Sequence, residues 1–458
     1  MPTNDVVTNP DAAVAREQVM SDDREHVFHS WSAQGAIDPL PVAGAEGCWF
    51  WDYDGRRYLD FSSQLVNTNL GHQHPRVVAA IKDQADRLCT IAPSFANDRR
   101  GELARRIADV APGDLDLVFF TNGGAEAVEN AVRLARLHTG RLKILSAYRS
   151  YHGSTAGAIT LTGDSRRWAN EPGIPGVARF FGPYLYRSAF HATTEAEECE
   201  RALQHLDQVI ALEGPPTIAA VILESVVGTN GVLVPPDGYL AGVREICDRY
   251  GVLMICDEVM AGFGRIGEWF AVDAWGVTPD LITFAKGVNS GYIPLGGVII
   301  SRRVAATFDD RVYPGGLTYS GHPLACAAAL ATLDVYRDDD IMGRVRQVGR
   351  DVVGPALADL AARHRAVGEV RGRGLMWAIE LVANRDTREP LGAEAMGRVT
   401  EDCKKRGLWP FMQPGRIHVV PPLIASDEEL RRGLSILDDV LEVADACAED
   451  TRQKAPTR

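Results

Sequence analysis

Long hydrophobic runs, paired cysteines and an excess of basic residues are all missing from this 458-residue sequence. The eight cysteines are scattered and none forms a CxxC pair, which favours free thiols in a reducing compartment over a disulfide framework. No apolar run approaches the ~20 residues of a membrane-spanning helix. The segment from Met1 to Glu25 is polar and charged, unlike a signal peptide. These absences predict a cytoplasmic protein that does not enter the membrane.

The charge balance is acidic, with a formal net charge of −13 at pH 7. An acidic surface repels nucleic acid and anionic lipid, so neither is an expected partner. Small anionic substrates remain compatible with this charge, because local positive groups can still line a pocket. A hydrophobic fraction of 46% and a charged fraction of 24% are typical of a globular protein. The length exceeds that of one ordinary hydrophobic core, which predicts two or more domains.

Helices and strands alternate in the middle of the sequence, which is typical of a mostly parallel sheet covered by helices. The expected strands are Leu117–Phe120, Leu142–Ala147, Ala219–Glu224, Val252–Cys256 and Leu281–Ala285. The helices expected around them are Glu102–Val110, Glu126–Thr139, Thr194–Glu213 and Tyr239–Tyr250.

The two ends of the sequence have a different character. An Asp-Gly turn within Cys48–Asp60 predicts a hairpin. After residue 323 the expected helices and short strands indicate a smaller α+β domain, and Glu449–Arg458 is expected to be disordered. These later elements are Leu324–Tyr336, Met376–Leu381, Ala393–Arg406, Ile417–Val420 and Asp427–Cys447.

Two expected strands end in residues that suit one particular chemistry. Asp257 and Glu258 follow Val252–Cys256, and Lys286 follows Leu281–Ala285. Because the carboxyl ends of parallel strands meet at one edge of the sheet, an Asp and a Lys there would lie together. A lysine amine that forms a Schiff base, and a carboxylate beside a pyridine nitrogen, are what pyridoxal phosphate requires. Alone, the pair is also compatible with a surface lysine and a helix cap.

Three further segments fall at the same expected edge. The string Thr121–Ala127 opens a helix with two glycines, which suits a phosphate, although a simple strand-to-helix turn also explains it. Tyr151 follows a strand, where its ring can stack on a pyridine. The turn Leu317–Pro323 carries hydroxyls before a helix, which suit an anion or a cap. His72 and His74 lack the companions of a metal site, so no metal is expected.

The motifs in order resemble those of the class III (omega) aminotransferases, which are pyridoxal-phosphate enzymes of fold type I. The resemblance extends from about Gly47 to Ser435. The motifs that carry it are WDYDGRRYLD, NLGHQHP, FFTNGGAEAVENA, SYHGST, AVILESVVG, ICDEVMAGFGRIG, PDLITFAKG and TYSGHP.

The resemblance implies an α/β fold with a large domain, built on a mostly parallel seven-stranded sheet, and a smaller α+β domain formed by both chain ends. It divides the chain into an N-terminal segment at 1–70, a large cofactor-binding domain at 71–325 and a C-terminal small domain at 326–458. A homodimer is also implied.

Site residues follow by the same resemblance. Lys286 is expected to bind pyridoxal 5′-phosphate covalently and then to move the substrate proton, and Asp257 to pair with the pyridine nitrogen. The other expected cofactor contacts are Gly124 and Ala125 at the phosphate, Tyr151 and Val259 on the two ring faces, His152 and Glu224 nearby, and Thr318 reaching the phosphate in the neighbouring subunit.

Several departures from the family bear on the substrate. The string Glu224–Gly228 and Met260 both differ from what relatives that act on GABA and ornithine often carry, which favours the amine, β-alanine and taurine group. In that group an arginine often binds the acceptor carboxylate. Arg416 and Gln413 are alternative residues for that position, and only the arginine supplies a charge.

The sequence therefore predicts a ping-pong aminotransferase that moves an amino group from an ω-amino acid, a taurine-like amine or another primary amine to pyruvate or 2-oxoglutarate. An aminomutase or racemase on the same fold is the alternative. A protein that binds the cofactor without catalysis fits less well, because a binder needs neither Lys286 nor Asp257.

Overall fold

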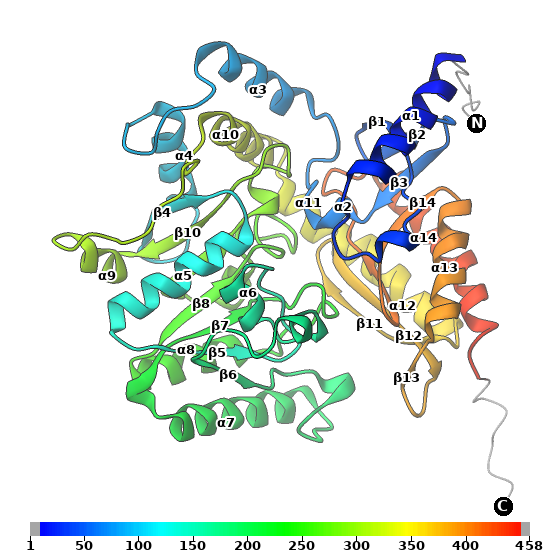
Figure 1. Ribbon diagram of the computed structural model, residues 1–458. Helices are drawn as coiled ribbons and strands as arrows, with labels where there is room; N and C mark the ends of the chain where they lie inside the picture. The colour runs from blue at the N-terminus through cyan, green and yellow to red at the C-terminus, as the bar shows by residue number, and fades with distance from the viewer. Residues whose placement is uncertain (1–9, 450–458) are drawn as a thin grey trace, which may run out of the picture.

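The computed structural model describes residues 10–449 and contains two sheets, each with its own helices. Figure 1 shows the seven-stranded sheet with its helices on one side, and on the other side a layer built from both ends of the chain, coloured blue and orange to red. Of the segment predicted to be disordered, only Glu449 lies within the described residues. No helix in this range is both long and apolar enough to cross a membrane.

The first sheet has seven strands in the order β4-β10-β9-β8-β7-β5-β6. The strands β6, β5, β7, β8 and β9, which are neighbours in this order, are all parallel. Strand β10 runs antiparallel to both of its neighbours, β9 and β4. This confirms the predicted seven-stranded, mostly parallel sheet. Its strands are β4 Leu115–Thr121, β5 Lys143–Ala147, β6 Val177–Phe180, β7 Ile218–Glu224, β8 Leu253–Asp257, β9 Leu281–Phe284 and β10 Gly296–Ser301.

The central strands of this sheet are buried on both faces, which explains their continuous apolar sequences. Ile222 and Ile255 belong to the core under helix α5 (Gly124–Thr139), whereas Val221 and Met254 belong to the core that includes residues of α7 (Glu195–Glu213) and α8 (Tyr239–Tyr250). Alternate side chains along a strand point to opposite faces, so each strand supplies both cores.

The second sheet joins the two ends of the chain. Its order is β1-β2-β3-β14-β15-β12-β11, with β13 paired to β12. Strand β3 lies parallel to β14, with Leu59 opposite Leu408. This confirms the predicted small domain formed by both chain ends. Its strands are β1 Val42–Glu46, β2 Trp49–Asp52, β3 Arg57–Phe61, β11 Val367–Arg373, β12 Met376–Asn384, β13 Glu389–Pro390, β14 Leu408–Gln413 and β15 Arg416–Val419.

The remaining helices cover the two sheets and connect them. They are α1 Pro10–His26, α2 Ser63–Val66, α3 Pro75–Arg87, α4 Asp98–Ala108, α6 Ala156–Leu161, α9 Arg302–Ala305, α10 Pro323–Asp338, α11 Ile341–Val348, α12 Gly354–Arg363, α13 Ala393–Lys405 and α14 Asp427–Asp445. The predicted boundary at 70 falls between α2 and α3, and that at 325 falls inside α10. The division into three segments stays a prediction.

Candidate active site

Acidic and basic side chains gather where neighbouring parallel strands end. Glu224, the last residue of β7, is in register with Asp257, the last residue of β8, and Asp257 is in register with Thr283 of β9. Lys286 is the second residue after β9 and has a positive φ of 46°. For a lysine this left-handed conformation is uncommon and is characteristic of functional sites. The sheet therefore brings Glu224, Asp257 and Lys286 to one edge, which we call the catalytic edge.

Asp257 is held by two hydrogen bonds. The imidazole Nδ1 of His152 lies 2.7 Å from Oδ2, and the backbone N–H of Val259 donates to Oδ1 at 3.1 Å. Burial opposes the charged form of His152, yet the hydrogen bond and charge of Asp257 outweigh it and raise the pKa of the imidazole. The buried Nε2 of His152 has no hydrogen-bond partner within residues 10–449. Asp257 is thus fixed in position by His152 on one oxygen and by the backbone of Val259 on the other.

Glu224 joins two loops at this edge. Its carboxylate accepts the backbone N–H of Tyr151 at 2.9 Å and that of Gly228 at 2.7 Å. Burial raises the pKa of Glu224 to about 7, although the charge of His152 acts against this rise. The carboxylate therefore fixes Tyr151 and the loop after β7 relative to each other.

The Lys286 amine lies in an environment that favours its neutral form. Burial lowers the pKa of Lys286, while the carboxylates of Asp257 and Glu224 oppose the shift. The positive charge of Arg166 adds to the lowering. A neutral amine is the nucleophilic form of lysine, so this environment suits attack on a carbonyl carbon and the acceptance of a proton.

The start of helix α5 faces the same edge. Gly124 and Ala125 are its first residues, and their N–H groups have no carbonyl partner within the helix. Val259 packs against Gly124, since a Cβ added to that glycine would lie 2.9 Å from Cγ1 of Val259. The helix dipole and the N–H groups at this helix start are of the kind that suits a phosphate. Thr318 lies in an exposed turn before α10.

A group of arginines that sequence analysis did not bring together lies beside the catalytic edge. Arg187 donates to Glu380 Oε1 at 3.0 and 3.1 Å, and Arg371 donates to Oε2 at 2.8 Å. Arg416 is the register partner of Glu380 in the sheet. Arg149 stacks on Tyr184, with 4.8 Å from Cζ to the ring centroid. We call Arg149, Arg187, Arg371 and Arg416 the arginine cluster.

The arginine cluster has more positive than negative charge. Arg371 also binds Glu369, so Arg187 and Arg371 bind the carboxylates of Glu369 and Glu380 in a cluster of four guanidinium groups. The buried Nε of Arg416 finds no acceptor within the described chain. Gln413 is the register partner of Arg416 at the hairpin end of β14 and β15.

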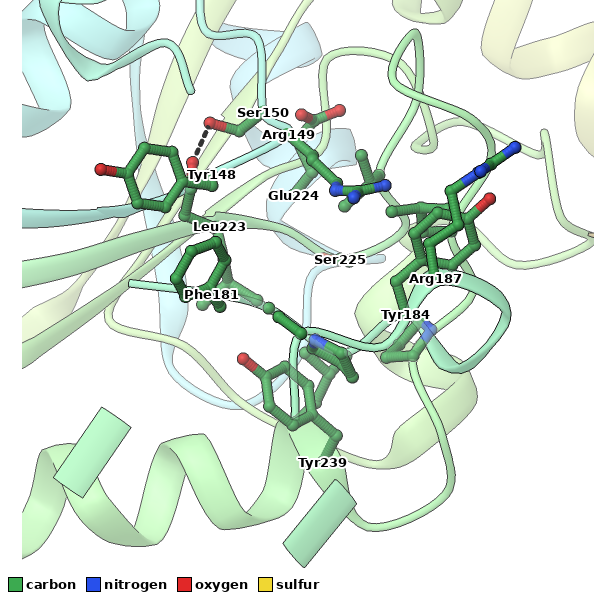
Figure 2. A pocket seen from close by; sticks show the side chains of 18 residues that line it. Tyr148, Arg149, Ser150, Phe181, Tyr184, Arg187, Leu223, Glu224, Ser225 and Tyr239 are labelled. Carbon is green, nitrogen blue, oxygen red and sulfur yellow. Dashed lines mark hydrogen bonds between the residues drawn. The ribbon is translucent and has the colours of Figure 1, made fainter. Parts of the chain in front are cut away.

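A small cavity connects the arginine cluster to the catalytic edge. It has a volume of about 50 Å³, and Figure 2 shows Arg149, Arg187, Tyr184 and Glu224 among the residues that line it. Glu224 belongs to both places, because its carboxylate also holds the backbone of Tyr151. The cavity lies at the carboxyl ends of β5 and β7, beside Asp257 and Lys286 rather than around them.

This set of groups fits pyridoxal phosphate. Lys286 offers an amine for its aldehyde, Asp257 a buried carboxylate for its ring nitrogen, and the start of α5 a phosphate site. The fold and the site together define a pyridoxal-phosphate-dependent enzyme of fold type I.

Comparison with known proteins gives the family. The profile of the class-III aminotransferases matches residues 32–441, and the chain belongs to this family. A solved taurine:2-oxoglutarate aminotransferase from Bifidobacterium kashiwanohense, in complex with pyridoxal phosphate and glutamate, is 45% identical with a TM-score of 0.91. That match covers 94% of this chain and 98% of the other.

Two further relatives agree. An (S)-enantioselective omega-transaminase from Thermomicrobium roseum is 36% identical with a TM-score of 0.88, over 93% of this chain and 98% of the other. A 5-aminovalerate aminotransferase from Pseudomonas aeruginosa is 35% identical over 88% of this chain and 93% of its own length. The chain is therefore a class-III aminotransferase, and its cofactor is pyridoxal phosphate.

Proposed function

We propose that this aminotransferase takes the amino group from a small primary amine that carries an anionic group at its other end, and gives it to a 2-oxo acid. The observation that carries the proposal is the surplus of guanidinium groups in the arginine cluster, which shares a cavity with Glu224 of the catalytic edge. The relatives named for taurine and 5-aminovalerate support it, because both compounds are primary amines with a terminal anion. Taurine and ω-amino acids are the donors in this proposal, and pyruvate or 2-oxoglutarate are the acceptors.

Each residue of the catalytic edge has its own role in this proposal. Bound pyridoxal phosphate supplies an aldehyde for the amino group and a ring that accepts electrons. Lys286 Nζ binds that aldehyde at rest and, once released, takes the proton from the donor carbon that bears the amino group. Asp257, fixed by His152, keeps the ring nitrogen protonated.

The other expected contacts hold the cofactor in place. Gly124 and Ala125 donate N–H groups to the phosphate. Tyr151 and Val259 enclose the ring, and Glu224 fixes Tyr151. Donor and acceptor bind in turn to the same site, as a ping-pong reaction requires.

Arg416 binds the carboxylate of the acceptor in this proposal, and Gln413 does not. Two observations support this choice. The Nε of Arg416 has no acceptor within residues 10–449, and the neighbouring carboxylate of Glu380 is already bound by Arg187 and Arg371. A guanidinium binds a carboxylate through two parallel hydrogen bonds with full charge, which an amide does not offer.

The test is the donor half of the reaction, followed by absorbance. The yellow holoenzyme is mixed with taurine, β-alanine, GABA, ornithine and a simple aryl amine in separate samples without a 2-oxo acid. We expect taurine or β-alanine to remove the yellow band and 2-oxoglutarate or pyruvate to restore it. If no amine removes the band, the proposal is wrong. Turnover of an amine without any 2-oxo acid would instead support the aminomutase or racemase alternative.

A homodimer completes the site in this proposal, with Thr318 of one subunit at the cofactor phosphate of the other. The exposed turn of Thr318 supports this arrangement. Thr318→Ala is expected to weaken cofactor binding about tenfold through the loss of a hydrogen bond to a charged phosphate. In a mixed dimer, the subunit with Thr318→Ala keeps its own Lys286 and receives an intact Thr318 from the subunit with Lys286→Ala. We therefore expect tight cofactor binding at that one site, measured by cofactor titration. No regain in the mixed dimer contradicts the shared site.

A further inference from the structure

A further guanidinium group, that of Arg166, lies at the catalytic edge and is not part of the arginine cluster. Arg166 belongs to a 3₁₀ turn, Ser165–Asn170, after α6. Its Cζ lies 3.7 Å from the centroid of the Tyr151 ring, and its Nη2 donates to Thr229 Oγ1 at 2.8 Å. Tyr151 follows β5 and Thr229 follows β7, so Arg166 spans two loops of the catalytic edge.

The orientation of Arg166 is fixed on one side only. Asp164 accepts from its Nε at 3.0 and 3.1 Å and also from Nη2, and Asn230 donates to Asp164 at 2.9 Å. Within residues 10–449, Nη1 of Arg166 has no acceptor. An ion pair therefore holds the guanidinium in place and leaves one nitrogen available to donate.

Arg416 approaches the same threonine from the second sheet. Its Nη2 donates to the carbonyl oxygen of Thr229 at 3.4 Å, which is long for a hydrogen bond. Its buried Nε has no acceptor in the described part of the chain. The carboxylate of Glu380 lies near Arg416 but is already bound by two other arginines. Arg416 thus has only a long hydrogen bond to Thr229, the residue that Arg166 also contacts.

We propose that Arg166, Arg416 and the Thr229 hydroxyl form one anion subsite, which binds the terminal sulfonate or carboxylate of the substrates. The inference rests on the proposed function and adds Arg166 as a residue that determines specificity. Two guanidinium groups approach the anion from different loops, and the Thr229 hydroxyl adds a third donor. A sulfonate has three oxygens and can accept from all three groups, whereas a carboxylate has two oxygens in one plane.

The first test measures binding of anions that cannot react. Ethanesulfonate and propionate lack the amino group, so calorimetry with the holoenzyme reports binding alone. Arg166→Leu is expected to weaken ethanesulfonate binding about 10- to 100-fold, the range for a hydrogen bond between charged groups. The matched control is Arg167→Leu in the same turn, because Arg167 pairs with Glu171 and lies over Tyr148. That control is expected to stay within about twofold.

The second test separates specificity from damage to the fold. The rates at which taurine and butylamine remove the yellow band are compared in wild type, Arg166→Leu and Arg166→Lys. We expect Arg166→Leu to lower the taurine rate at subsaturating concentration about 10- to 100-fold and to leave butylamine within about threefold, with Arg166→Lys between. Equal losses for both amines, or unchanged ethanesulfonate binding, overturn the inference. If wild type reacts with neither amine, the proposed function fails, and calorimetry still decides the role of Arg166.

Discussion

The catalytic edge and the arginine cluster are built in different ways. Each acid or base of the catalytic edge ends a strand of the seven-stranded sheet or follows one within a few residues. The arginine cluster instead assembles side chains from the loop after β5, a turn after β6 and strands β11 and β15, and its Arg187–Glu380 pair spans 193 residues. The catalytic edge is thus set within one sheet. The arginine cluster depends on how the two sheets pack together.

The largest effect is expected from a change at the catalytic edge. Lys286→Ala removes both the amine that binds the cofactor and the base, so turnover should fall by at least ~10⁴-fold. The rate of amino transfer to a 2-oxo acid measures this. Lys143→Ala is the matched control, because Lys143 pairs with Glu213 at the start of β5 and should keep its activity. A Lys286→Ala variant with full turnover would sink the proposed mechanism.

A change in the arginine cluster should affect binding more than chemistry. Arg416→Leu is expected to raise the KM for 2-oxoglutarate about 10- to 100-fold, since it removes a charged pair of hydrogen bonds, and to change kcat much less. Steady-state kinetics with varied acceptor measure both constants. Gln413→Ala is the control and should change neither constant by more than about twofold. The reverse result would give the role to Gln413.

Glu258 is a buried acid next to Asp257, but its hydrogen bonds support the fold and not the reaction. It accepts the N–H groups of Ala271 and Val272, and burial raises its pKa from 4.5 to about 7. A carboxyl with a raised folded-state pKa stabilises the fold below the unfolded pKa, and this contribution is lost as the pH rises through 7. We therefore expect Glu258→Gln to lower the free energy of unfolding by ~2 kcal/mol at pH 5, because an amide accepts at one end only.

The difference between wild type and Glu258→Gln should shrink toward pH 8 by ~2 kcal/mol, since wild type alone loses the contribution of the neutral carboxyl. Chemical denaturation at the two pH values measures it. The kcat of the variant should stay within about twofold, unlike that of any variant at Lys286. A difference that grows with pH would show that Glu258 is ionised in the fold.

Strand ends explain why much of the catalytic edge could be predicted. Asp257 and Lys286 stand directly after apolar runs. Gly124 lies where an apolar strand is followed by the pattern of an amphipathic helix. The bond between His152 and Asp257 was not predicted, since nothing local joins two residues 105 positions apart.

The features that sequence analysis missed have weak local patterns. β10 opens with two glycines, and β14 contains Pro410, both of which argue against a strand. Strand β11 carries two arginines, a glutamate and two glycines, so it shows no apolar alternation. Arg166 lies in the irregular region after α6, where its role depends on contacts with Tyr151 and Thr229 that only the fold creates.

The pairing of β3 with β14 also constrains the order in which the protein can form. All strands of the seven-stranded sheet lie between residues 115 and 301 and are synthesised before β14. Strand β3 cannot pair with β14 until Leu408, the partner of Leu59, has been synthesised. At ribosomal speeds of ~5–20 residues per second, this delays the pairing by a time on the order of tens of seconds. During that time the hairpin of β2 and β3 has an unpaired edge, a surface that invites association with other chains. Newly made chains are therefore most exposed to aggregation after the cofactor-binding sheet is complete and before the second sheet closes.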